Sequence, residues 1–301
     1  MMRIRYLISY IVIAVFLLYL FLPIAFCIIG SIMPETELRS PPGSKLWFAR
    51  GPTTVYYQYV FLAPFGFEFP SQDPYIRYEI RSLVILNIAY FGRILLNSVV
   101  VASAVAVTNF FLASLAAFAF TRFNFKGRTS LFTFVLISRL LPPVVLAVPY
   151  YVLMQILGLV NNLASIILVH IVLSLPFSIW YLVLYYRTIP IEIEEASRVD
   201  GASLWQTIRY ITMPVAGTGL IAIALFSFLT SYNEFLFAHF LLGRIDVQTV
   251  PVFVASMATA TDVYWAMMYS ILTLTMLPMI AAVLLILRFI NISQLAGAMK
   301  F

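Results

Sequence analysis

Six long apolar segments constrain this chain more than any other feature of its sequence. A helix of about 20 residues, rising about 1.5 Å per residue, crosses the roughly 30 Å hydrocarbon core of a bilayer. Because lipid offers the backbone no hydrogen-bond partner, each segment must be helical, and the runs are too continuously apolar for the alternating strands of a membrane β-barrel. The sequence therefore predicts an all-α membrane protein with six transmembrane helices. The expected spans are Leu7–Ile29, Ile94–Phe120, Leu131–Leu157, Leu163–Tyr185, Val215–Ala238 and Tyr264–Leu287.

The composition agrees with this class, since 63% of the residues are hydrophobic and only 10% are charged. An ordinary soluble domain carries about 25% charged residues. The net charge of +6 does not indicate a nucleic-acid partner, because the basic residues stand singly between apolar runs and form no patch. Cys27 is the only cysteine, so an intrachain disulfide is impossible.

Lysine and arginine positions indicate how the chain is oriented in the membrane. Arg3 and Arg5 precede a first apolar run that is longer than the roughly 7–15 residues of a signal-peptide core, so we expect residues 1–30 to remain as an anchor. With the N-terminus inside, most basic residues next to short loops fall on the cytoplasmic side, as the positive-inside rule requires. We therefore expect a multi-pass protein of the cell membrane with both termini in the cytoplasm.

Residues 31–93 form a long loop that this orientation places outside the cell. The loop is rich in proline, tyrosine and phenylalanine, and its aromatic content argues against disorder. We expect a small ordered extracytoplasmic lobe, with Tyr78–Tyr90 as an amphipathic segment leading into the second span. Residues 94–301 then form a five-helix core. Alanine and serine crowd its first helix, which predicts close helix packing there.

The loop over residues 188–214, between the fourth and fifth spans, is polar and acidic. Glutamates after Pro190 fall where a helix N-terminus favours negative charge, and Gly201 can adopt the left-handed conformation that ends a helix. Ser203 and Gln206 have capping-box spacing, which predicts a second helix that Pro214 then breaks. We expect two short helices on the cytoplasmic membrane surface, although solvated glutamates in an ordinary connection are the simpler alternative.

The loop resembles the "EAA" loop of ATP-binding-cassette importer permeases. The resemblance rests on Glu195, Ala196, Ser197, Asp200, Gly201, Ala202, Ile211 and Pro214, with Ser197 in place of an alanine. Further stretches resemble the carbohydrate-importing branch of that family, of the maltose-permease small-subunit type. They are residues 93–98, 117–123, 127–128 and 232–235.

The resemblance implies the type I importer permease fold and a set of partners. In that family the EAA loop docks into a cleft on a cytoplasmic ATPase subunit and transmits nucleotide-driven closure to the membrane helices. We therefore expect a second, homologous permease, two ATPase subunits and an extracytoplasmic solute-binding protein. The implied solute is a di- or oligosaccharide of the maltose or trehalose class. Other polar solutes, such as glycerol phosphate, remain open.

Three polar residues within the expected spans are candidates for the translocation pathway. Arg139 precedes Pro142 and Pro143, and a buried arginine should face a wet cavity or the bundle interior. It could equally serve backbone carbonyls that the prolines leave unpaired. Asn233 and Glu234, late in the fifth span, either line the pathway or meet interfacial water. His170 and His239 are expected to be satisfied core or interfacial histidines.

Several motifs are absent from the sequence. It contains no phosphate-binding loop of the G-x-x-x-x-G-K-[ST] type, no zinc-protease motif and no nucleophile elbow. We therefore expect a transport subunit that is not an enzyme and holds no cofactor or metal, with ATP and Mg²⁺ on the partner ATPases. Two rival hypotheses are a secondary transporter that works alone and a scaffold that anchors another subunit without conducting solute.

Overall fold

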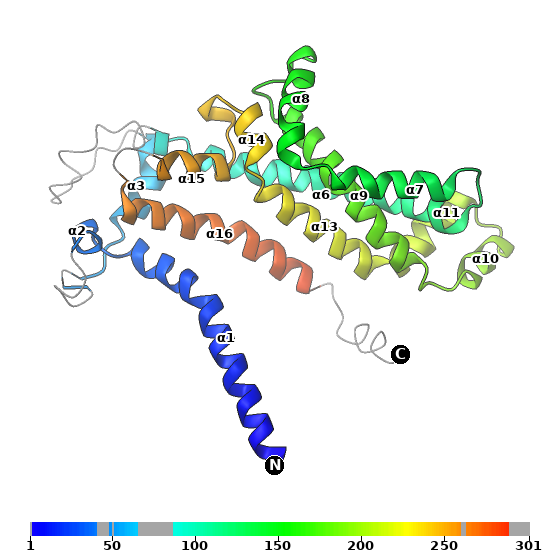
Figure 1. The fold of residues 1–301 in the computed structure, drawn as a ribbon, viewed down its shortest axis with the longest axis horizontal. Helices are drawn as coiled ribbons and strands as arrows, with labels where there is room; N and C mark the ends of the chain where they lie inside the picture. Colours follow the sequence, from blue (N-terminus) through cyan, green and yellow to red (C-terminus); the bar gives the residue numbers. More distant parts are fainter. Residues whose placement is uncertain (1, 41–47, 50, 66–86, 260–262, 289–301) are drawn as a thin grey trace. The chain divides into compact units, whose positions relative to one another are not determined.

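The structure is a computed structural model that describes residues 2–40, 48–49, 51–65, 87–259 and 263–288 (Figure 1). Within these ranges the regular structure is entirely helical. The principal helices are α1 (Met2–Ser31), α2 (Glu35–Leu38), α3 (Val55–Leu62), α6 (Phe91–Arg122), α7 (Arg128–Ile137), α8 (Pro143–Ile156), α9 (Leu163–Tyr186), α10 (Glu192–Val199), α11 (Leu204–Thr207), α12 (Met213–Val215), α13 (Gly217–Tyr232), α14 (Leu236–Leu241), α15 (Val250–Ala258) and α16 (Trp265–Leu287). Short turns complete the set: η1 (Ala63–Phe65), η2 (Ser138–Leu140), η3 (Ile208–Thr212) and η4 (Ile245–Val247).

The described residues contain four helices that are long and apolar enough to cross a membrane. These are Ser9–Ser31, Phe91–Arg122, Leu163–Tyr186 and Trp265–Leu287. Two further candidates are pairs of helices bent at a short break, so the chain has up to six spans when each bent pair counts as one. The expected all-helical membrane fold is confirmed at this level, whereas the number of six spans stays a prediction.

The third expected span, Leu131–Leu157, is not one straight helix. Arg128–Leu140 and Pro143–Ile156 meet at an angle of 99°. Leu141 is extended, with ψ of 126°, because the ring of the following proline disfavours the helical conformation there. Pro143 then fits the first turn of α8, where its missing N–H costs nothing. The two prolines therefore divide the segment.

The fifth expected span, Val215–Ala238, also differs from the structure. Its helix α13 ends at Tyr232, and α14 begins only at Leu236. At the start of the expected span, the segment Leu204–Val215 meets α13 at an angle of 79°. The apolar run therefore begins at a bend and contains a helix break, and hydrophobicity alone records neither.

The chain divides into two compact units, which are described separately. Unit 1 comprises Met1–Gly92 and Phe253–Leu277. Its centre is Glu35, which is fully buried and accepts hydrogen bonds from the backbone N–H of Trp265 (3.2 Å) and of Ala266 (2.7 Å). The carboxylate thereby satisfies free donors at the N-terminus of α16. The ordered extracytoplasmic lobe stays a prediction, and most of Tyr78–Tyr90 lies outside the described residues.

Unit 2 comprises Arg93–Val252 and Pro278–Phe301, and α6, α9 and α13 form its core. Small residues of α6 are fully buried there, among them Ala113, Ser114 and Ala117, which confirms the close packing predicted from the sequence. Helices α9 and α13 lie side by side (Figure 1). A Cβ atom built at Gly219 of α13 would lie 2.8 Å from the Tyr185 ring, so glycine is required for this approach. Helices α10 and α11 gather at one end of the unit.

Candidate functional site

Helix α10 has the local structure that the sequence predicts for the start of the 188–214 loop. Its first turn carries three glutamates and its last turn carries Arg198, as the helix dipole favours. Gly201 has φ of +88°, and the left-handed conformation ends the helix as expected. The Ala202 N–H donates to the Ser197 carbonyl over 3.0 Å, which satisfies one of the last free carbonyls.

The second helix of the loop begins with the predicted capping box. The Ser203 N–H donates to Gln206 Oε1 over 2.7 Å, and the Gln206 N–H donates to Ser203 Oγ over 3.4 Å. Helix α11 then widens into a π-helical turn over Ile208–Thr212 and continues as α12. Pro214 lies inside α12, and the direction changes just after it, where α13 begins. Two short helices before the fifth span are therefore confirmed.

The predicted loop residues divide between an exposed and a buried face of α10. Glu195, Ala196 and Asp200 are exposed, and Val199 between them has 88% of its surface exposed. Ser197 is buried and lies 3.0 Å from Thr207 Oγ1 of α11. This face therefore presents one apolar side chain among polar groups. The other predicted members are exposed Gly201 and Pro214, and partly buried Ala202 and Ile211.

The buried face of α10 is fixed by a pair of charges that the sequence analysis missed. Glu194 Oε2 lies 2.9 Å from Arg122 Nε at the end of α6, and the two side chains are only 2% and 8% exposed. Thr212 Oγ1 donates to the other carboxylate oxygen over 3.1 Å. The Arg122 guanidinium also donates to the carbonyl of Tyr186, the last residue of α9 (3.3 Å), and to that of Ile189 just after the helix (3.0 Å). One cluster therefore links α6, α9, α10 and the start of the fifth span.

The helical period contained a signal for this cluster. Glu194 and Ser197 are three residues apart and share a face, whereas Glu195 points elsewhere. Neighbouring glutamates on an amphipathic helix therefore face different surroundings, and here Glu194 is buried while Glu195 is exposed. The partner on α6 was not readable, because Arg122 lies 72 positions away in the sequence.

Arg139 occupies η2, at the bend between α7 and α8. Its side chain is exposed within the chain, donates to the Leu173 carbonyl of α9 over 3.1 Å, and lies 5.5 Å from the centre of the Phe177 ring. The contact with a backbone carbonyl fits the structural alternative named above, although its carbonyl belongs to a neighbouring helix. The exposure keeps the pathway hypothesis open.

Glu234 holds the break between α13 and α14. Its carboxylate accepts the backbone N–H groups of Phe237 (2.9 Å) and Ala238 (3.2 Å), and Oε2 lies 2.9 Å from His170 Nε2. His170 is 3% exposed, and its Nδ1 lies 2.7 Å from Ser231 Oγ. The expectation of a satisfied core histidine is therefore confirmed. Asn233 is exposed, unlike Glu234, and donates to the Leu229 carbonyl over 2.8 Å.

Comparison with known proteins finds relatives of this chain among transport proteins. Residues 109–296 match the family described as the binding-protein-dependent transport system inner membrane component. The trehalose/maltose transport system permease protein MalG of Thermococcus litoralis is 31% identical over 212 residues, which cover 70% of this chain and 76% of that protein. The inner membrane ABC transporter permease protein YcjP of Escherichia coli is 32% identical over 204 residues, covering 68% and 73%.

A solved structure shares the fold. It is a bacterial ABC transporter involved in the import of the acidic polysaccharide alginate, and its matching chain aligns with a TM-score of 0.71. The alignment covers 96% of this chain and 97% of the other, at 17% sequence identity. At 17% identity this similarity shows only a shared fold. Membership of the family rests on the sequence matches.

Proposed function

The chain belongs to the binding-protein-dependent family of inner membrane transport components, as a carbohydrate-type ABC importer permease, and we propose that α10 couples it to a cytoplasmic ATPase. Membership makes it a multi-pass membrane subunit that is not itself an enzyme. An ABC importer works with an ATPase and a solute-binding protein. The finer composition, with a second homologous permease and two ATPase subunits that hold ATP and Mg²⁺, is part of the proposal.

The exposed face of α10 is the observation that carries the proposal. Val199 protrudes between Glu195 and Asp200, while Glu194 on the opposite face is buried. A short helix with a fixed buried face can move only together with its neighbours. Its free face offers one apolar contact, charge-assisted bonds from two carboxylates and close backbone approach at Gly201.

Force on α10 would reach the membrane helices through the cluster around Arg122. Closure of the ATPase dimer on ATP would displace α10, and the ion pair with Glu194 would carry α6 along. Nucleotide can shift the equilibrium between the open and closed ATPase dimer only by binding the two states with different affinity. A loosely attached loop would not transmit that change to the membrane helices. Hydrolysis would then reset the transporter.

The proposed solute is a di- or oligosaccharide. Support comes from the relative MalG of T. litoralis, a trehalose/maltose transport system permease. Import of another polar solute, such as glycerol phosphate, is the alternative. Arg139 and Asn233 are the proposed pathway residues that lie at the surface of the single chain, whereas Glu234 would act by holding the break that presents Asn233.

The coupling proposal is tested by cross-linking and uptake in the assembled transporter. In a Cys27→Ser background, Val199→Cys should form a cross-link with the ATPase subunit, whereas Lys126→Cys, also exposed but on another loop, serves as the control. Val199→Asp should lower ATP-driven sugar uptake about tenfold, because an exposed hot spot is lost without a change in the core. Unchanged uptake together with no cross-link would refute coupling through α10.

The stand-alone transporter requires a separate test. Liposomes that contain only this chain should show no solute uptake in response to a proton or sodium gradient. Robust gradient-driven uptake without ATPase would contradict the proposed function. The scaffold alternative would be favoured if Val199→Asp preserved both assembly and transport.

A further inference from the structure

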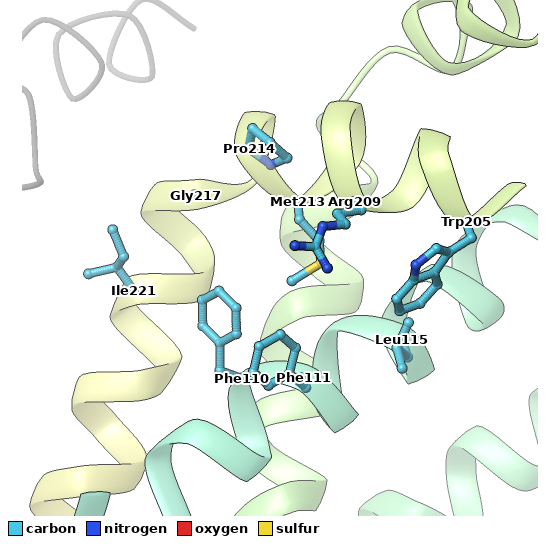
Figure 2. Close-up of a pocket in the computed structure, with 9 residues that line it drawn as sticks. All are labelled: Phe110, Phe111, Leu115, Trp205, Arg209, Met213, Pro214, Gly217 and Ile221. Carbon is cyan, nitrogen blue, oxygen red and sulfur yellow. The ribbon is translucent and has the colours of Figure 1, made fainter. Parts of the chain in front are cut away.

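A cavity of about 430 Å³ lies in unit 2 beside the 188–214 loop (Figure 2). Phe110, Phe111 and Leu115 of α6 form one side. Trp205 and Arg209 of the loop lie opposite and extend toward them, and Ile221 of α13 forms part of the remaining wall. The cavity is therefore bounded by a membrane helix, by the loop and by the first turns of the fifth span.

The chemistry of this cavity is amphipathic. Its walls are aromatic and aliphatic, apart from the guanidinium of Arg209. Within the described parts of the chain, Arg209 forms no ion pair, and its guanidinium carbon lies 5.8 Å from the centre of the Tyr210 ring. An uncompensated cation above an apolar floor is complementary to a ligand with an anionic head and an apolar tail.

The position of the cavity indicates which such ligand is at hand. The segment Leu204–Val215 meets α13 at 79°. Because the expected fifth span begins at Val215, the predicted topology places this segment at the membrane surface. Trp205 and Tyr210 are 55% and 66% exposed, and exposed aromatic residues of this kind are enriched at the level of lipid headgroups. In that topology the mouth of the cavity lies at the level of the lipid headgroups, where membrane lipid is the most abundant amphiphile.

We propose that the cavity binds an anionic phospholipid of the cytoplasmic leaflet. The phosphate pairs with Arg209, and an acyl chain lies against Phe110, Phe111 and Ile221. The leaflet assignment rests on the proposed function, because that places the loop in the cytoplasm. A guanidinium matches phosphate geometry bidentately, and the cytoplasmic leaflet supplies anionic headgroups.

A photo-crosslinking experiment on the assembled transporter tests this site. Benzoylphenylalanine in place of Ile221 is irradiated in nanodiscs of phosphatidylcholine with or without phosphatidylglycerol, and adducts are identified by mass. We expect a phosphatidylglycerol adduct in preference to phosphatidylcholine. Arg209→Gln should reduce it roughly fivefold, as expected for one basic residue at a lipid surface. Arg187→Gln, an exposed arginine outside the cavity, should leave it unchanged.

A second pair of variants changes the space and not the charge. A Cβ atom at Gly217, on the rim of the cavity, has no neighbour within 4 Å, so Gly217→Ala is tolerated and Gly217→Leu projects into open space. We expect Gly217→Leu to reduce the lipid adduct and Gly217→Ala to retain it. A protein adduct of the second permease, or equal labelling by both lipids, would overturn the proposal.

The outcomes also separate this inference from the coupling proposal. The lipid adduct is measured without nucleotide, so it does not depend on α10 contacting an ATPase. Loss of the Val199 cross-link with a retained phosphatidylglycerol adduct would refute coupling alone. A retained Val199 cross-link with no lipid selectivity would refute the lipid site alone.

Discussion

Arg122 and Glu194 bring opposite charges within 2.9 Å where both side chains are almost inaccessible to water. Removing one member of such a pair leaves an uncompensated buried charge, at a typical cost of about 3–5 kcal/mol, whereas replacing both by apolar residues is often nearly neutral. Arg122→Met should therefore destabilise the protein by an amount in this range. Arg122→Met combined with Glu194→Met should recover much of the loss.

Thermal unfolding of the purified protein in detergent measures this double-mutant cycle. Arg128→Met is the control, because Arg128 is only partly buried and bonds only locally, to Asn124 Oδ1 and the Phe123 carbonyl. Its effect should stay within about 0.5 kcal/mol. Strictly additive effects of the Arg122 and Glu194 substitutions would show that the two residues do not interact.

Glu234 makes a second prediction possible, because three groups depend on its carboxylate. Glu234→Ala leaves two backbone N–H groups at the start of α14 and one His170 nitrogen without this acceptor. Each unsatisfied buried group costs about 1–3 kcal/mol, so the loss should exceed that of a typical substitution. Asn233→Ala, next to it but exposed and bonded only to one carbonyl, should have little effect on thermal unfolding. Equal stability of the two variants would contradict this account of the break.

The helical elements differ in how far they were predictable, and the reason is physical. Gly201 and the Ser203–Gln206 box act within a few residues, so their spacing alone announces a helix end and a helix start. The pairing of Arg122 with Glu194 is set by tertiary packing, which a local pattern does not contain. The bends have a different origin, since an apolar run has the same composition whether it is straight or folded back. Prolines marked two of them, the pair at 142–143 and Pro214.

The bend between α7 and α8 should depend on those two prolines. Pro142→Ala with Pro143→Ala restores two N–H donors and removes the restriction on Leu141, so the helices should straighten. Spin labels on the exposed positions Phe134 and Leu153 would then lie about 28 Å apart, as in a continuous helix. In the parent the 99° bend holds them closer. Distances from pulsed electron resonance check this, and an unchanged distance would assign the bend to tertiary contacts.

Across the part of the molecule that the structure describes, much apolar surface faces outward, as is typical of a chain in a bilayer. In Ser9–Ser31, a window of the helix with mean hydropathy of 3.0 has none of its residues buried within the chain. A helix that is hydrophobic all round belongs in lipid or in the centre of a larger assembly. The other three single-helix candidates bury 22–44% of their windows, so they combine lipid contact with packing. Much of the apolar surface of these helices is therefore left for lipid or for partner subunits to cover.

The orientation of the molecule in that membrane gives the last prediction. With both termini in the cytoplasm, the 188–214 loop faces the cytoplasm and the turn that holds Arg244 faces outside. In a Cys27→Ser background, Val199→Cys should react with a membrane-impermeant maleimide only after the cells are opened, whereas Arg244→Cys should react in intact cells. Both positions are exposed, so access and not burial decides the labelling. The reverse pattern would contradict the orientation and, because an ATPase could not then reach α10, the coupling proposal with it.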